Sequence, residues 1–173
     1  LALPRATLPG PSILFAFVDG EEALVEYGPK DGLYGSYRLS MRIGRERKKD
    51  PVHAVIVVDM IGDKNLNVTI PPNTAPTLRK LALDAAHEGG VRSFFSLGEQ
   101  DILDDHVPFM QANLPAVNLI DFHYGAWGRN DYWHTREDTM DKLSAESLEI
   151  VGRTVLRMLN RLSAPPTAAE SEK

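Results

Sequence analysis

ILFAFVDGEEALVEYGPKDGLYGS, residues 13–36, joins a continuous apolar run to a loop that opens with adjacent carboxylates at Glu21 and Glu22. The apolar run at 13–18 predicts a strand buried on both faces, as in a parallel or mixed sheet. Two adjacent acids just beyond a strand point in different directions and so suit different tasks. One can coordinate a cation while the other takes a proton from a bound water. On the pair alone, a solvated acidic turn is the more ordinary interpretation.

Apolar runs and amphipathic stretches alternate along the rest of the chain. This alternation predicts an α/β fold, a three-layer α/β/α sandwich around a mostly parallel mixed sheet. Ser36 and Ser144 are suited to cap two of the helices. The remaining strands are expected at 53–58, 92–97 and 115–120, and the helices at 35–49, 75–88, 107–113 and 144–162.

The ends of the chain differ from its middle in composition. Residues 1–12 are rich in proline and glycine and predict an irregular lead-in, whereas 163–173 predict a disordered tail. One domain is therefore expected at 13–162. Three of its four expected strands end in an aspartate, at Asp19, Asp59 and Asp121. Ligands of α/β folds bind beyond the carboxyl ends of the strands, so these carboxylates are expected along one edge of the sheet.

Two further segments carry residues that suit a metal site. His134 stands in the motif YWHT inside a long loop at 121–143, among several acidic residues. A lone histidine is more often structural, but imidazole with carboxylates is a ligand set that zinc accepts. The motif DDHVPF carries Asp104 and Asp105, which could hold the ligands or a general base in place.

Charge and composition exclude several classes of function. The net charge of the 173 residues is -5, and the one basic cluster, RIGRERKK at 42–49, is typical of an exposed helix, so no nucleic-acid partner is expected. The absence of cysteine excludes disulfides, thiolate metal sites and a cysteine nucleophile. No apolar run approaches the roughly 20 residues that a membrane-spanning helix needs, so no membrane span is expected.

Four motifs occur in a telling order: FVDGEEA followed by DGLYGS, then DMIGD, DDHVPF and YWHTREDTMDKLSAESL. Together they resemble the catalytic half of the zinc aminopeptidase and glutaminyl cyclase family, over about 13–162. The resemblance implies a zinc-exopeptidase fold with this segment as part of its catalytic domain. It also implies one or two zinc ions, a peptide or aminoacyl substrate, and a secreted or periplasmic protein.

The resemblance implies a role for each matching residue of the metal site. Glu21 matches the general base or proton shuttle, and Glu22 and His134 match zinc ligands. Asp59 matches a ligand of the second zinc in the two-zinc aminopeptidases. In the single-zinc cyclases, the aspartate at this place instead hydrogen-bonds near the base.

Three more residues match positions of the cyclase pocket. Asp104 matches an acid of the hydrogen-bond network around the base, and Trp133 matches an aromatic residue that lines the substrate pocket. Tyr27 stands where cyclases often carry a tryptophan at the pocket rim.

The family pattern also includes a His-x-Asp segment and a metal-bridging aspartate before the paired glutamates, whereas positions 1–12 hold neither acid nor histidine. The N-terminal strands and ligands are therefore expected to be missing, and an N-terminal half is an expected partner. Three interpretations stay open. A zinc-dependent hydrolase acting at peptide N-termini is slightly favoured, a glutaminyl-peptide cyclotransferase is the alternative, and a non-catalytic or incomplete fragment is the third.

Overall fold

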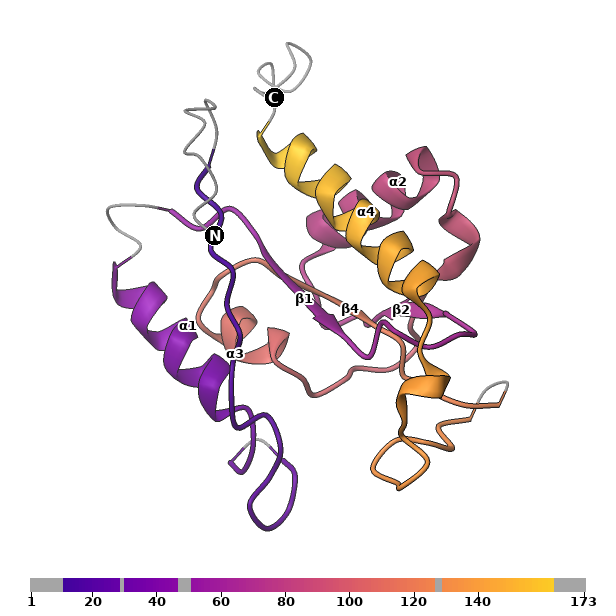
Figure 1. Cartoon of the computed structure of the whole chain (residues 1–173). Helices are drawn as coiled ribbons and strands as arrows, with labels where there is room; N and C mark the ends of the chain where they lie inside the picture. Colours follow the sequence, from indigo (N-terminus) through magenta and orange to yellow (C-terminus); the bar gives the residue numbers. More distant parts are fainter. Residues whose placement is uncertain (1–10, 29, 47–50, 127–128, 164–173) are drawn as a thin grey trace, which may run out of the picture.

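The structure of the chain, a computed structural model, describes residues 11–28, 30–46, 51–126 and 129–163 (Figure 1). Most of the expected lead-in and almost all of the expected tail lie outside these residues. No helix in the described ranges is long and apolar enough to cross a membrane.

The centre of the fold is a four-stranded mixed sheet in the order β1-β4-β2-β3. β1 pairs with β4 in parallel, β2 pairs with β3 in parallel, and β2 meets β4 antiparallel at Thr69 and Ile120. All five residues of β4 are buried, because strands flank it on both sides and helices cover both faces. The strands are β1 Val55–Asp59, β2 Val68–Ile70, β3 Phe95–Leu97 and β4 Ala116–Ile120.

Four helices cover the sheet, with α2 and α4 packed together on one face and α1 and α3 on the other (Figure 1). This arrangement confirms the predicted three-layer α/β/α sandwich. Alternate residues of β4 serve the two faces, as the two-residue period of a strand requires. Val117 and Leu119 join the core beneath α2 and α4, whereas Ala116 packs with Phe109 beneath α1 and α3. The helices are α1 Tyr34–Glu46, α2 Pro76–Glu88, α3 His106–Gln111 and α4 Ala145–Ser163, with 3-10 turns at Arg92–Phe94 and Met140–Lys142.

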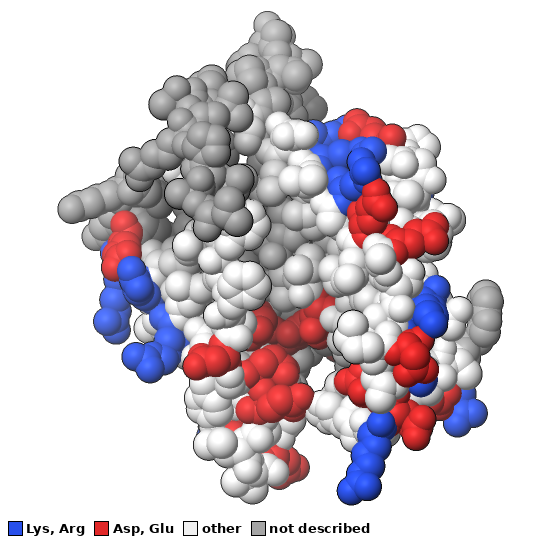
Figure 2. Space-filling view, viewed as in Figure 1, with Lys and Arg blue, Asp and Glu red and all other residues white. Residues whose placement is uncertain are grey.

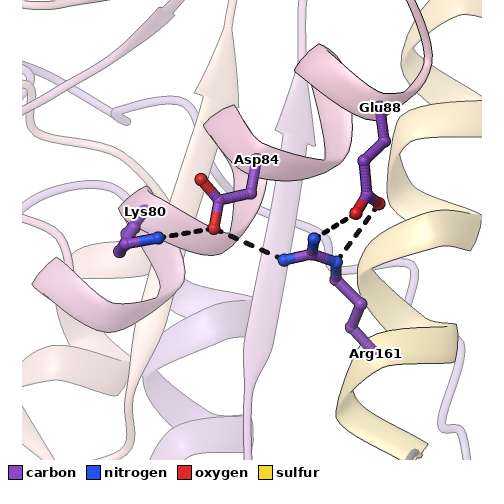
Figure 3. Close-up of polar contacts among 4 residues, drawn as sticks. All are labelled: Lys80, Asp84, Glu88 and Arg161. Carbon is purple, nitrogen blue, oxygen red and sulfur yellow. Dashed lines mark hydrogen bonds and ion pairs between the residues drawn. The ribbon is translucent and has the colours of Figure 1, made fainter.

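An ionic network also joins α2 to α4 (Figure 3). The guanidinium of Arg161 lies between Asp84 and Glu88, and Lys80 Nζ lies 2.6 Å from the same Asp84 carboxylate. These side chains are partly or largely exposed, and exposed ion pairs typically contribute well under about 1 kcal/mol each. The apolar core therefore holds the two helices together, and the network adds to their alignment.

The strand expected at 13–18 does not form, which corrects the sequence prediction. The segment has no regular secondary structure, and Phe15 and Phe17 are 76% and 98% exposed. A strand needs a neighbour to satisfy its backbone groups, and no strand among the described residues pairs with this one. β1, at the edge of the sheet, is likewise less buried than expected, with Val58 47% exposed.

One of the two expected serine caps forms and the other does not. Ser144 caps α4, because its Oγ accepts the Ser147 amide at 3.4 Å, and Gly90 ends the α2 region with φ +70°. Ser36 does not cap α1. It lies inside the first turn, where its hydroxyl donates to the Leu33 carbonyl at 3.0 Å.

Backbone groups of the preceding loop cap α1 instead. The amides of Leu33, Tyr34 and Gly35 donate to the carbonyls of residues 21, 20 and 19, each at 2.9 Å. The first amides of a helix have no partner within the helix, so this loop satisfies three of them at once. Gly35 permits the close approach, because a Cβ there would lie 2.4 Å from the Asp19 carbonyl oxygen. We call these three hydrogen bonds the α1 clamp.

We expect Gly35→Ala to break the α1 clamp and to destabilise the protein by about 1–3 kcal/mol, because backbone on both sides would have to move apart. Gly44→Ala is the matched control in the same helix, since its Cβ would meet nothing nearer than Ala112 at 4.0 Å. That substitution should be neutral or stabilising by up to about 1 kcal/mol. Urea unfolding of both variants measures the difference, and equal midpoints would contradict the clamp.

Candidate functional site

Glu22 and His134 meet although 112 residues separate them in the sequence. His134 Nε2 lies 2.7 Å from Glu22 Oε1, and both side chains are about half exposed. His134 itself has φ +56°, a left-handed conformation uncommon for a residue with a side chain. Such strain often accompanies functional sites. The structure thus brings together the two residues expected as zinc ligands.

Glu21 lies beside this pair and is held by Tyr27. The Tyr27 hydroxyl donates to Glu21 Oε1 at 2.5 Å and lies 3.1 Å from the Leu103 carbonyl oxygen. Burial raises the pKa of the Glu21 carboxyl, the hydrogen bond from Tyr27 lowers it, and the charges of Glu22 and Asp104 raise it further. Glu21 is therefore a carboxylate whose proton affinity is increased, as suits a general base.

Asp104 lies behind the base and is almost fully buried, at 4% exposure. Its Oδ2 accepts a hydrogen bond from Asn118 Nδ2 at 2.6 Å, and its Oδ1 accepts the amide of Asp105 at 2.5 Å. The sequence analysis missed Asn118. The available signal was an amide in the middle of an otherwise apolar strand, PAVNLI, because a buried polar side chain needs a partner.

Asp59 ends β1, and the charge of Glu21 is one of the causes that shift its pKa. Burial raises its pKa to about 7, followed by the charges of Asp104 and Glu21. Acidic side chains gather at the lower centre of the molecular face in Figure 2, with basic ones towards its sides. No lysine or arginine of the described residues forms an ion pair with Glu21, Asp59 or Asp104.

Asp59 and Asp121 lie where the neighbouring parallel strands β1 and β4 end, at one edge of the sheet as expected, whereas Asp19 follows no strand. Asp121 has a different role from Asp59. Its carboxylate is fully buried and accepts the amides of Asn67 at 2.8 Å and His123 at 3.1 Å. It therefore anchors the start of the loop that carries His134. Asp19 contributes through its backbone carbonyl, in the α1 clamp.

Trp133 and Phe122 form an aromatic surface next to the histidine. The Trp133 ring stacks on the His134 ring with centroids 3.8 Å apart and an interplanar angle of 23°. Phe122 lies 5.4 Å from Trp133 in a tilted arrangement. Both rings remain more than one-third exposed, so they can contact a ligand at this point of the surface.

Asp31 organises the loop that follows the paired glutamates, and the sequence analysis missed it. Its carboxylate accepts the amides of residues 24, 25 and 26 at 2.8–2.9 Å and the Tyr34 hydroxyl at 2.8 Å. These hydrogen bonds hold the pKa of Asp31 well below its usual range. The signal was an Asp-Gly pair directly before the helix, where aspartates commonly bind loop amides.

The donor set partly fits a zinc ion. Glu22 and His134 present a carboxylate oxygen and an imidazole nitrogen at one point, and zinc accepts both. In the part of the chain that the structure describes, no group of three or more histidine, cysteine, aspartate or glutamate side chains is arranged to hold a metal. The pair thus provides two of the three or more protein ligands that zinc sites use.

Comparisons with known proteins find similarity to one peptidase family and to glutaminyl cyclases and an aminopeptidase of similar fold. A model of Peptidase family M28 matches residues 2–159. The structure of a glutaminyl cyclase from an Acidobacteriales bacterium is 35% identical in sequence with a TM-score of 0.77, covering 85% of this chain and 51% of that one. A leucine aminopeptidase precursor from Bacteroides thetaiotaomicron is 25% identical with a TM-score of 0.64, covering 83% and 51%.

A similar relation holds for the glutaminyl-peptide cyclotransferase of Drosophila melanogaster, which is 28% identical over 165 residues, 82% of this chain and 45% of its own length. The chain therefore spans about half the length of the relatives that it matches.

We expect Asp31→Asn to loosen the loop at 24–26, because an amide group cannot replace both acceptor oxygens. Faster hydrogen exchange of those amides measures the effect, with Glu26→Gln, an exposed carboxylate of the same loop, as the control. In the wild type, the lowered pKa makes this contribution fully present above the unfolded value of about 3.9. It is lost only as the pH falls through the lower folded value. Exchange unchanged by Asp31→Asn would contradict this role.

Proposed function

The chain belongs to peptidase family M28. From that premise, we propose that it contributes the residues of a zinc-dependent enzyme that acts at the N-termini of peptides. The proposed substrate is an N-terminal glutamine, and the proposed product is pyroglutamate. The observation that carries this proposal is the meeting of Glu22 and His134, 2.7 Å apart, directly beside Glu21. A metal-ligand pair next to a carboxylate of raised pKa combines a Lewis-acid site with a base.

Glu22 and His134 would hold the zinc ion, with further ligands from outside the described residues. When bound, zinc polarises the carbonyl of the substrate amide. Trp133 stacks on the His134 ring, which fixes the orientation of that ring and offers an apolar surface to the substrate. Besides burial, the charge of Asp104 raises the pKa of Glu21, and the charges of Asp104 and Glu21 in turn raise the pKa of Asp59.

In the proposed reaction, the α-amine of the substrate attacks the side-chain amide carbon of its own N-terminal glutamine. A carbon–nitrogen bond forms and closes a five-membered ring, and the bond to the amide nitrogen breaks. Glu21 takes the proton from the attacking amine and delivers it to the departing nitrogen, so ammonia leaves and the base is regenerated. A carboxylate that accepts and returns one proton needs a pKa nearer to neutrality than a solvated glutamate has.

Cyclisation is favoured over hydrolysis by the place of Asp59. Burial and the charges of Asp104 and Glu21 raise its pKa, so Asp59 belongs to the electrostatic surroundings of the proposed base. That is the arrangement the resemblance implies for single-zinc cyclases. The glutaminyl cyclase from the Acidobacteriales bacterium, at 35% identity, supports the same choice.

Hydrolysis by an aminopeptidase is the second candidate. The likeness to the leucine aminopeptidase precursor from Bacteroides thetaiotaomicron favours it. Glu21 would then take a proton from an attacking water, and Asp59 would serve a second metal ion.

The decisive experiment uses the full-length gene product that contains this chain. Its zinc content and its turnover of a glutaminyl peptide and of leucine amide are measured together. One zinc per protein with ammonia release from the glutaminyl peptide supports the cyclase, and two zincs with leucine release support the aminopeptidase. A metal-free protein inactive on both substrates overturns the proposal and leaves a non-catalytic role.

We expect Glu21→Gln to reduce turnover by roughly 10²–10⁴-fold, because it removes the group that moves the proton. Zinc content should stay close to the wild-type value, since the substitution removes a base and leaves the ligands in place. Glu26→Gln, on the same loop, is the control and should keep full activity. Loss of zinc in Glu21→Gln would show that the roles of the two adjacent glutamates are assigned wrongly.

We expect His134→Ala to weaken zinc binding by at least about 10–100-fold, the range found when only residues supporting a ligand are removed. Competition with a fluorescent chelator measures the dissociation constant. His87→Ala, an exposed histidine near the end of α2, is the matched control. Equal zinc affinity in the two variants would remove His134 from the ligand set.

A further inference from the structure

The hydroxyl of Tyr27 points at the carboxylate of Glu21. The family resemblance implies only a position for its ring at the rim of the substrate pocket. The hydroxyl oxygen lies 2.5 Å from Glu21 Oε1 and 3.1 Å from the Leu103 carbonyl, a residue 76 positions away. The single phenol proton is therefore shared, with the shorter contact to the carboxylate. The side chain is 40% exposed, so solvent reaches its outer side.

The ring of Tyr27 is fixed by the backbone beneath it. A Cβ at Gly32 would lie 3.0 Å from Tyr27 Cε2 and 3.1 Å from Cδ2, closer than ordinary packing allows. Gly32 has φ +123°, a conformation that residues with a side chain rarely adopt. The ring thus occupies the space that a side chain at Gly32 would need. Its position follows from the same DGLYGS segment that forms the α1 clamp.

The second acceptor of the hydroxyl is also held in place. Asn73 pins the neighbouring residue of that loop, because its Nδ2 donates to the Ile102 carbonyl at 2.8 Å and its Oδ1 accepts the Ile102 amide at 3.3 Å. The Leu103 carbonyl is therefore a fixed point next to Asp104. Tyr27 connects the loop of the paired glutamates to the loop that carries the buried acid.

We propose that Tyr27 is a positioning residue for Glu21, holding Oε1 so that Oε2 is the oxygen that exchanges the proton with the substrate. This inference rests on the proposed function, in which Glu21 is the base. No hydrogen bond within the described residues involves Oε2. An unheld glutamate would sample several rotamers, and ordering such a side chain has a cost in rotamer entropy. Tyr27 meets that cost before the substrate arrives.

The test compares Tyr27→Phe with Tyr37→Phe in the full-length gene product. Tyr37 lies on the exposed side of α1, and its hydroxyl forms no hydrogen bond within the described residues, so it controls for the loss of a phenol group. We expect Tyr27→Phe to lower kcat at least about tenfold with KM within about twofold, because the ring stays while the hydroxyl contacts with the charged Glu21 and with the Leu103 carbonyl are lost. Tyr37→Phe should match the wild type.

Amide hydrogen exchange gives a readout independent of activity. Tyr27→Phe should speed exchange in peptides covering 20–28 and 98–104, because the hydroxyl joins these two loops, whereas Tyr37→Phe should change neither. Zinc content should stay at the wild-type level in both variants.

A rim role for Tyr27 gives the opposite pattern. If Tyr27→Phe has wild-type kcat and exchange while Tyr27→Leu raises KM, Tyr27 acts through its ring alone and the inference is overturned. A wild-type protein inactive on glutaminyl and aminoacyl substrates overturns the proposed function first, and the inference falls with it. An active wild type with an unaffected Tyr27→Phe overturns the inference and leaves the proposed function standing.

Discussion

The α1 clamp is the constraint on which the geometry of the candidate site depends. Three amides at the start of α1 have no partner inside the helix, and the carbonyls of residues 19–21 satisfy them. This fixes the backbone on both sides of Gly20 relative to a helix that packs on the sheet. The side chains of Glu21 and Glu22 therefore leave from a backbone held at three successive points. Gly35 lets the two backbones come into contact, so the geometry of the site requires a residue without a Cβ at this position.

The other half of the site depends on β4. This strand is buried along its whole length, so its position is set by packing on both faces. It delivers two constraints: Asn118 in its middle donates to Asp104, and Asp121 just beyond its end accepts the amides of residues 67 and 123. The first places an acid behind Glu21, and the second directs the long loop that returns with His134. A buried carboxylate that accepts two backbone amides is a strong anchor, because moving it would leave those donors without this partner.

Much of the architecture could be predicted from the sequence. The helices α2 and α4 are indicated by their amphipathic periodicity and, for α4, by a capping serine, and β4 is indicated by its apolar run. The short strand β2 could not be predicted, because three residues carry no period. The run at 13–18 shows a deeper limit: apolar character indicates that a segment is suited to a sheet, but only a pairing partner makes it a strand. Asn118 and Asp31 were missed for a related reason, since their importance lies in the groups they bind and not in the motifs around them. The approach of Glu22 to His134 was expected only through the family resemblance.

The charges of the site explain why donors such as Tyr27 and Asn118 matter. Burial and the charge of Asp104 raise the pKa of both Glu21 and Asp59, and no lysine or arginine of the described residues forms an ion pair with these carboxylates. Carboxylates crowded in this way repel one another, so each ionised form needs a neutral hydrogen-bond donor or a nearby cation. Asn118 supplies a donor to Asp104, and Tyr27 supplies one to Glu21. The backbone amide of Met60 lowers the pKa of Asp59, but burial and the charges of Asp104 and Glu21 raise it to about 7. The hydroxyl of Tyr27 therefore favours the charged form of Glu21, which is the form that the proposed base requires, whereas burial favours the neutral form of Asp59.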